Sequence, residues 1–292
     1  MYFSRVQIRS DIKELSEISR ILKDDTHGLH RMLWSLFPEQ EARTFIYREE
    51  IAREQLSPLP AARGQPVYYL VSKHKPDIDE NSLFKVESKD YQPQLFIGQK
   101  LQFDCRVNPV ITRHNKKHDV VMDEQLTFLQ TLLKAYQLDS LLSVKHDKGE
   151  YKKLLLANGG AELDSKLTQL LKADSRYAER LDQITTLSDK LEWAIKAQID
   201  AALENWLKRQ GERFGFSIAA DHYGALKLQN SAYIWHGLPH KTKLKDKKSG
   251  FSSVDFSGEL EVTDPAKFEQ ALYQGIGRSK AFGCGLLLVR RV

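Results

Sequence analysis

The residue pattern changes twice along the chain, and these two changes constrain the fold more than any other feature. Up to about residue 122, short segments alternate apolar and polar residues, which is typical of half-buried strands. From Leu126 to about Arg209 the chain is rich in Leu, Ala, Lys, Gln and Glu, with apolar residues at helical spacing. Strand-like segments return from Phe214 onward. We therefore predict an α+β protein in which a helical module interrupts a β-rich chain.

The first β-rich part has the element order of a ferredoxin-like unit. A helix is predicted over His27–Phe37, because Asp and Thr residues precede it as N-caps and Pro38 ends it. A short turn or helix is expected at Pro76–Glu80. The predicted strands are Tyr2–Ile8, Thr44–Glu50, Pro66–Ser72, Leu83–Ser88 and the long Gly98–Pro109. We assign residues 1–122 to an N-terminal ferredoxin-like domain and 123–205 to the helical insertion.

The last part, residues 206–292, is assigned to a C-terminal domain. Strands are expected at 214–218, 225–229 and 251–262. Asp264 and Pro265 then open a helix that runs to Tyr273, and the apolar run Leu286–Val289 is typical of a buried strand. The chain therefore ends in the order helix, loop, strand.

Glycines and cations alternate in the loop between that helix and strand, at Gly275, Gly277, Arg278, Lys280, Gly283 and Gly285. Residues without a Cβ let a phosphate approach main-chain N–H groups, and the cations add positive charge. A tight helix-to-strand turn would also need glycines, so both interpretations remain open. The order of elements excludes a dinucleotide fingerprint, and the absence of Gly-Lys-Ser/Thr excludes a Walker loop.

The helix near the amino terminus carries candidate catalytic residues. His27, His30 and Arg31 share one flank of this helix, away from the apolar face. Histidine suits proton transfer near neutral pH, and a second histidine beside an arginine suits phosphate binding. The alternative is that His27 is a capping residue and His30 a half-buried surface residue. No acidic or third histidine ligand accompanies the pair, so we expect no metal site and no cofactor.

Other cations form candidate phosphate contacts. Tyr233 and Trp235 precede a lysine-rich segment, and basic charge beside aromatic residues is typical of nucleic-acid contacts. The alternative interpretation is a solvated hairpin tip for the basic segment Arg113–His118 and a disordered solubilising loop for the lysine-rich segment. The candidate residues are Arg106 on the long strand, Arg113, Lys116 and Lys117 beyond it, and Lys241, Lys243, Lys245, Lys247 and Lys248.

Charge and cysteine content set wider limits. The net charge of +5 permits an anionic partner without requiring one. Cys105 and Cys284 lie far apart in apolar segments, so neither a disulfide framework nor a zinc site is expected. No apolar run reaches membrane-spanning length and no signal-type start is present, so we expect a cytoplasmic protein without a membrane partner.

Five stretches taken together resemble the CasE family, the CRISPR precursor-RNA endoribonucleases of type I-E Cascade complexes. Residues 1–120 and 205–292 carry the resemblance, and the helical stretch near 126–203 is not covered. The matching stretches are Met-Tyr-Phe-Ser-Arg-Val at the start, His30–Pro38, Phe103–Pro109, Lys248–Gly250 with Phe256–Gly258, and Gln274–Leu286.

The resemblance implies two ferredoxin-like, RRM-related domains in tandem and metal-free cleavage at the base of a CRISPR repeat hairpin. It implies as partners the repeat RNA, whose product stays bound as the 3′ handle of the guide RNA, and other Cascade subunits. The family histidine falls on His30, and His27 stands where some members carry a tyrosine. Ser35 stands where one branch uses a lysine. RNA supplies its own 2′-hydroxyl nucleophile, so the expected products are a 2′,3′-cyclic phosphate and a 5′-hydroxyl.

Three alternatives accompany this interpretation. A binding module would hold the RNA hairpin without cutting it, with the same fold and the same cations. An interaction protein would use the helical insertion to dock another Cascade subunit or an accessory factor. A metal-dependent nuclease would need clustered carboxylates, and the β-rich parts of the sequence contain no such cluster.

Overall fold

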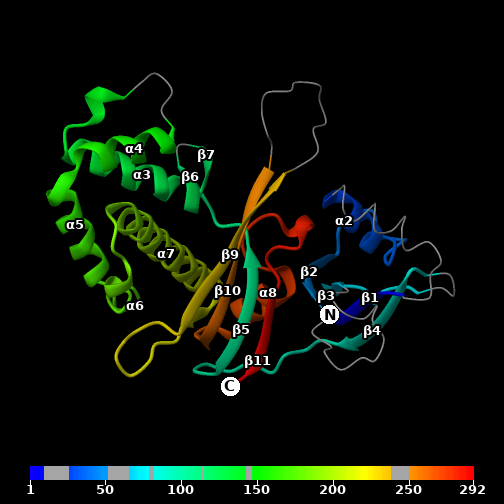
Figure 1. Cartoon of the computed structure of the whole chain (residues 1–292). Coiled ribbons are helices and arrows are strands. Elements are labelled where there is room, and N and C mark those ends of the chain that lie inside the picture. The colour runs from blue at the N-terminus through cyan, green and yellow to red at the C-terminus, as the bar shows by residue number, and fades with distance from the viewer. Residues whose placement is uncertain (10–25, 52–65, 79–81, 114, 143–146, 238–249) are drawn as a thin grey trace, which may run out of the picture. The chain divides into compact units, whose positions relative to one another are not determined.

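The computed structural model describes residues 1–9, 26–51, 66–78, 82–113, 115–142, 147–237 and 250–292. The chain divides into two compact units (Figure 1). Met1–Pro109 and Lys208–Val292 form the first unit, and Val110–Leu207 forms the second.

The first unit begins with a four-stranded antiparallel sheet of order β2-β3-β1-β4. Its strands are β1 (Tyr2–Ile8), β2 (Phe45–Ile51), β3 (Pro66–Ser72) and β4 (Phe84–Asp90), close to the predicted segments. Helix α2 (Thr26–Trp34) packs on one face, where Leu33, Leu36 and Phe37 join apolar side chains of the strands in a buried core. A short turn or helix was predicted at Pro76–Glu80; residues 76–78 form neither, and residues 79–81 lie outside the described part.

A second antiparallel sheet completes the first unit, with order β11-β5-β10-β8 and with β9 also pairing β10. Helix α8 (Pro265–Gln274) and the glycine loop lead into its last strand, in the predicted order. The bounds are β5 (Lys100–Val107), β8 (Phe216–Ile218), β9 (Leu228–Gly237), β10 (Gly250–Val262) and β11 (Leu287–Arg291). The protein is therefore α+β with two ferredoxin-like sheets in tandem.

Strand β5 differs from the expectation that it belongs to the N-terminal domain. It pairs with β10 and β11 of the second sheet, and β4 fills the last place of the first sheet. Its inward residues Leu101, Phe103 and Cys105 are buried there. Alternation along a strand indicates that one face is buried, but it does not identify the neighbouring strands.

The two sheets share apolar contacts inside the first unit. Ile46 of β2 and Val71 of β3 pack with Leu286 in one buried cluster. The Tyr273 hydroxyl in α8 donates a hydrogen bond to the Tyr91 carbonyl oxygen over 3.1 Å. These contacts hold residues from both ends of the chain in one body.

The second unit is a helical module entered through a short hairpin, β6 (Val110–Arg113) with β7 (Lys116–Asp119). Its helices enclose a leucine-rich core, and Asp119, Asp147 and Asp174 cap three of them. Successive helices end and begin at 158–160 and at 172–175. Polar residues in the sequence predicted a break at each of these places. The bounds are α3 (Val120–Ala135), η2 (Asp139–Leu141), α4 (Lys148–Asn158), α5 (Gly160–Lys172), α6 (Ser175–Ala178), η3 (Leu181–Gln183) and α7 (Leu187–Phe214), which continues into the first unit.

Candidate active site

Helix α2 holds His30 at the border between the core and the surface. The apolar side of the helix buries Leu33, whereas the side chain of His30 is half-buried. Its ring packs against three aromatic rings, with centroid distances of 5.3 Å to Trp34, 5.6 Å to Phe45 and 6.4 Å to Tyr47. This aromatic wall orients the imidazole and leaves part of it accessible. The position fits both a catalytic residue and a half-buried surface histidine.

Tyr47 of β2 connects this histidine to the glycine loop. Its hydroxyl donates a hydrogen bond to the Ala281 carbonyl oxygen over 3.1 Å. Burial raises the pKa of Tyr47 well above its usual range, so the phenol stays protonated and remains a donor. Both α2 and β2 contact η4 (Lys280–Phe282), a short helical turn within the loop. Residues near the amino terminus and residues near position 280 therefore meet at one place.

Replacing Tyr47 with phenylalanine should loosen the loop without unfolding the protein. The change removes one hydrogen bond, which contributes about 1 kcal/mol. We expect a loss of that order in the free energy of unfolding, with faster hydrogen exchange of the amides at 280–285. Tyr223→Phe is the control, because Tyr223 is 85% exposed. Unchanged exchange in Tyr47→Phe would show that this bond does not hold the loop.

The glycines in the loop are required by the path of its own backbone. Gly285 has φ of +96°, and a Cβ there would lie 2.5 Å from the Ile276 carbonyl oxygen. The Gly285 amide donates to the Arg106 carbonyl oxygen over 2.7 Å, which ties the loop to β5. Gly275 and Gly277 also have positive φ, at +72° and +71°. The tight-turn interpretation thus holds here, and it is compatible with phosphate binding beside the loop.

Two arginines that the sequence did not single out act electrostatically on Lys280. Burial lowers the pKa of Lys280, and the nearby positive charges of Arg43 and then Arg213 lower it further. Arg43 lies two residues before β2, and Arg213 lies in the last turn of α7. Neither belongs to a motif, and they lie far from Lys280 in the sequence. No sequence pattern indicated them.

The other predicted cations occupy varied positions. Arg106 forms a bidentate ion pair with Asp255, at 2.7 and 2.9 Å, so its charge is already balanced. Arg278 is exposed, and its backbone bridges that of Asn108. Arg31 is exposed on α2. The five predicted lysines between 241 and 248 lie outside the described residues, and so does the side chain of His27.

The cations predicted beyond β5 fall in the helical unit. Arg113 pairs with Asp123 at 2.7 Å. Lys116 and Lys117 are exposed on β7. A contribution of these three cations to RNA binding stays a prediction.

A second histidine joins the β9–β10 hairpin to the loop. The His236 ring stacks on Phe251 at 4.6 Å, and Phe251 stacks on Phe282 of η4 at 5.0 Å. His236 Nε2 lies 2.8 Å from the Ser253 hydroxyl. Burial and the charge of Arg106 lower the pKa of His236, whereas Asp255 raises it. No motif of the sequence indicated a role for His236.

Metal-ligating residues do not gather in the described part of the chain, which contains no group of three His, Cys, Asp or Glu side chains able to hold an ion. Cys105 and Cys284 are buried free thiols, and burial raises the pKa of each to about 12.

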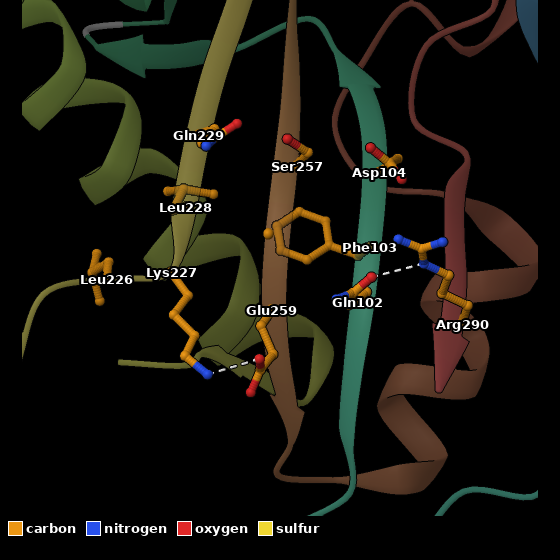
Figure 2. Close-up of a pocket in the computed structure, with 11 residues that line it drawn as sticks. Gln102, Phe103, Asp104, Leu226, Lys227, Leu228, Gln229, Ser257, Glu259 and Arg290 are labelled. Atoms are coloured by element: carbon orange, nitrogen blue, oxygen red, sulfur yellow. Dashed lines mark hydrogen bonds and ion pairs between the residues drawn. The ribbon is translucent and has the colours of Figure 1, made fainter. Parts of the chain in front are cut away.

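A separate groove lies on the second sheet, with a volume of about 440 Å³ (Figure 2). Strands β5, β9, β10 and β11 supply its lining, together with Leu226 and Lys227 just before β9. Both cations of the lining have partners, since Arg290 donates a hydrogen bond to Gln102 over 2.7 Å and Lys227 forms an ion pair with Glu259 at 2.9 Å. Phe103 is the aromatic residue of the lining and is buried. Sheets that bind single-stranded RNA stack bases on exposed aromatic residues, which this lining does not offer.

The fold and the site define a class: a tandem ferredoxin-like protein with a helical insertion and a histidine-bearing helix beside a glycine loop. A family model described as CRISPR associated protein matches residues 1–291. The chain belongs to this family of CRISPR-associated proteins, which confirms the family resemblance predicted from the sequence motifs.

Solved structures of related fold cover the whole chain. One is a CRISPR endoribonuclease Cse3 bound to a 19-nucleotide RNA, with TM-score 0.59, 20% identity, and coverage of 99% of this chain and 100% of that chain. Another is Thermus thermophilus Cse3 bound to an RNA representing a pre-cleavage complex, with TM-score 0.56, 19% identity, and coverage of 99% and 98%. A third is a CRISPR-associated protein from Thermus thermophilus, with TM-score 0.52, 20% identity, and coverage of 99% and 100%. These likenesses support the tandem fold.

No curated protein matches the sequence. Among the described residues, none of the helices has both the length and the apolar character that a membrane crossing requires.

Proposed function

We propose that this protein is a metal-independent endoribonuclease that cleaves CRISPR precursor RNA at the base of the repeat hairpin. One observation carries the proposal: the half-buried imidazole of His30 lies beside Tyr47, and Tyr47 is hydrogen-bonded to the glycine loop from the other end of the chain. An acid–base group and a cationic loop thus meet at one place. The family match and the fold shared with RNA-bound Cse3 structures support RNA as the substrate.

The chemistry requires no group beyond the RNA and the protein. A base removes the proton of the 2′-hydroxyl, the 2′-oxygen attacks phosphorus, and the bond from phosphorus to the 5′-oxygen breaks. An acid then protonates the 5′-oxygen, which leaves a 2′,3′-cyclic phosphate and a 5′-hydroxyl. His30 performs one of these two proton transfers, and His27 is its proposed partner. Cations near the loop stabilise the charge that builds up on the phosphate.

Recognition of the hairpin is proposed to rest on backbone and shape, because A-form RNA hides its base edges in a deep groove. We assign this role to exposed cations rather than to the groove on the second sheet. Arg31, Arg278 and the lysines between 241 and 248 are the main candidates, with Lys116 and Lys117 on the helical unit. We further propose that the product stays bound as the handle of the guide RNA within a cytoplasmic Cascade complex.

A cleavage assay in chelator tests the reaction. Purified full-length protein should cut its cognate repeat RNA in EDTA, and the product should carry a 2′,3′-cyclic phosphate. A 2′-deoxy substitution at the scissile nucleotide should abolish cleavage, because it removes the nucleophile, while binding stays within about threefold. Cleavage that needs added metal would contradict the mechanism. Binding of unmodified RNA without any cleavage would instead indicate a hairpin-binding subunit.

A further inference from the structure

The β9–β10 hairpin continues beyond the rest of the second sheet. Strand β10 pairs with β5 from Val254 onward, whereas residues 250–253 pair with β9. The two strands therefore extend as a ribbon past the end of β5 (Figure 1). One face of this ribbon packs on η4, because the ring of Phe251 lies between the rings of His236 and Phe282. The ribbon is thus joined to the candidate active site.

The opposite face of the ribbon carries Trp235. Successive side chains of a strand point to opposite faces, so Trp235 faces away from the ring of its neighbour His236. Its indole lies across Gly250 of the partner strand, since a Cβ added at Gly250 would be 2.6 Å from Cζ2 and 2.8 Å from Cε2 of the ring. A glycine is required here to leave room for the ring. The backbone at Gly250 therefore supports part of the indole, while Trp235 is 50% exposed.

Trp235 is the only exposed tryptophan of the four in the chain, all of which lie among the described residues. The N–H groups of Trp34 and Trp206 each donate to a backbone carbonyl oxygen over 3.3 Å. The ring of Trp193 packs on Tyr177, with 5.9 Å between the centroids. Within the described part of the chain, no other ring stacks on the indole of Trp235 and no residue accepts a hydrogen bond from it. Its open surface is therefore available to a ligand.

A planar nucleobase is the ligand that this arrangement fits. An aromatic ring that is supported by backbone and exposed to solvent is a platform on which any base can stack. The other positions of the ribbon beside Trp235 are Gly237, Gly250 and Ser252, whereas a protein interface would surround its aromatic anchor with apolar side chains. In the sequence, five lysines follow β9 and precede β10, which favours a polyanion over an apolar partner.

We propose that Trp235 is a stacking site for one unpaired base of the RNA strand that flanks the repeat hairpin. The bases of an A-form stem are already stacked and paired, so an aromatic side chain reaches bases that lie outside the stem. This inference rests on the proposed function, because RNA is taken as the ligand. It adds a contact to the flank that does not depend on base identity, beside the backbone contacts to the stem.

Equilibrium binding of two RNAs to the full-length protein tests the site. Both RNAs share one stem-loop; the first has unpaired nucleotides on each side and a 2′-deoxy scissile nucleotide that prevents cleavage, and the second ends at the stem. Trp235→Ala should weaken binding of the flanked RNA by about tenfold and leave binding of the stem unchanged. Trp235→Phe should keep much of the affinity, because a phenyl ring also stacks. The loss should be similar at low and high salt, because stacking releases no counterions.

Ile234→Ala is the matched control. Ile234 is 43% exposed on the same strand, but its side chain lies on the opposite face of the ribbon. This variant should keep the wild-type ratio of the two affinities. Tryptophan fluorescence gives a direct measurement: the flanked RNA should quench wild type more strongly than Trp235→Phe, and the stem should quench both proteins alike.

Two results would overturn the stacking site. One is an equal loss of affinity for both RNAs in Trp235→Ala, and the other is a wild-type ratio of affinities in that variant. If the ratio depends on Trp235 but wild type leaves unmodified repeat RNA uncut in EDTA, the stacking site stands and the nuclease proposal fails. Cleavage by wild type, with a ratio that does not depend on Trp235, supports the nuclease and removes the stacking site.

Discussion

Replacing His30 with alanine should lower the rate of RNA cleavage by about 100- to 10,000-fold, the usual contribution of a general acid or base. Hairpin binding should stay close to wild type, because the cations assigned to RNA binding lie on other side chains. The His30 ring contacts three aromatic rings, so its loss also leaves a partly exposed cavity. We therefore expect a modest loss of stability beside the large loss of activity. Single-turnover cleavage in EDTA, with binding and unfolding measured on the same preparation, separates these effects.

Two control variants make this result specific. His74→Ala removes an exposed histidine at the end of β3 and should cleave at the wild-type rate. His30→Gln keeps much of the packing but cannot exchange a proton near neutral pH, so it should be as inactive as alanine. Appreciable cleavage by His30→Gln would assign the histidine to structure and would remove the main support for the enzyme.

Replacing Gly285 with alanine should produce the second large effect, on both stability and activity. The position combines φ of +96° with a backbone oxygen 2.5 Å from the new Cβ. A left-handed conformation costs alanine about 1–2 kcal/mol, and the overlap adds about 1–3 kcal/mol. We expect the free energy of unfolding to fall by about 2–5 kcal/mol. Cleavage should fall as well, because the loop that carries Lys280 must move.

Gly224→Ala separates the cost of the left-handed backbone from the cost of steric overlap by the new Cβ. Gly224 has φ of +85°, but no heavy atom lies within 4 Å of its added Cβ. The free energy of unfolding of Gly224→Ala should therefore fall only by the conformational cost, about 1–2 kcal/mol, and the variant should cleave RNA at the wild-type rate. Urea unfolding of the two variants compares them directly. Equal stability of Gly285→Ala and wild type would show that the loop relaxes freely and is not held by its packing.

The sequence predicted the positions of helices and strands more reliably than it predicted which strands pair in a sheet. Alternating residues located β1 and β5, since a half-buried strand leaves a period of two in the chain. The same alternation in β5 did not indicate its sheet, because pairing depends on residues far away in the sequence. The helical module was predicted from its leucine spacing, which matches the buried core of that unit.

The site was predicted in part for a similar reason. His30 and the glycine loop lie in compact motifs, so the sequence indicated both. Arg43 and Arg213 are isolated residues whose charges act on Lys280 only in the folded chain. Arg106 was predicted to bind phosphate, but the cross-strand residue Asp255 already pairs with it. A single sequence does not show which cations have acidic neighbours in space.

The place of β5 in the second sheet has a consequence for synthesis of the protein on the ribosome. Both of its partners, β10 and β11, follow the helical module in the sequence. A nascent chain therefore carries an apolar strand with two unpaired edges until β10 and β11 have been translated. Unpaired edges of this kind promote association between chains. The first sheet has all four of its strands by Asp90, so it is able to form long before β5 finds its partners.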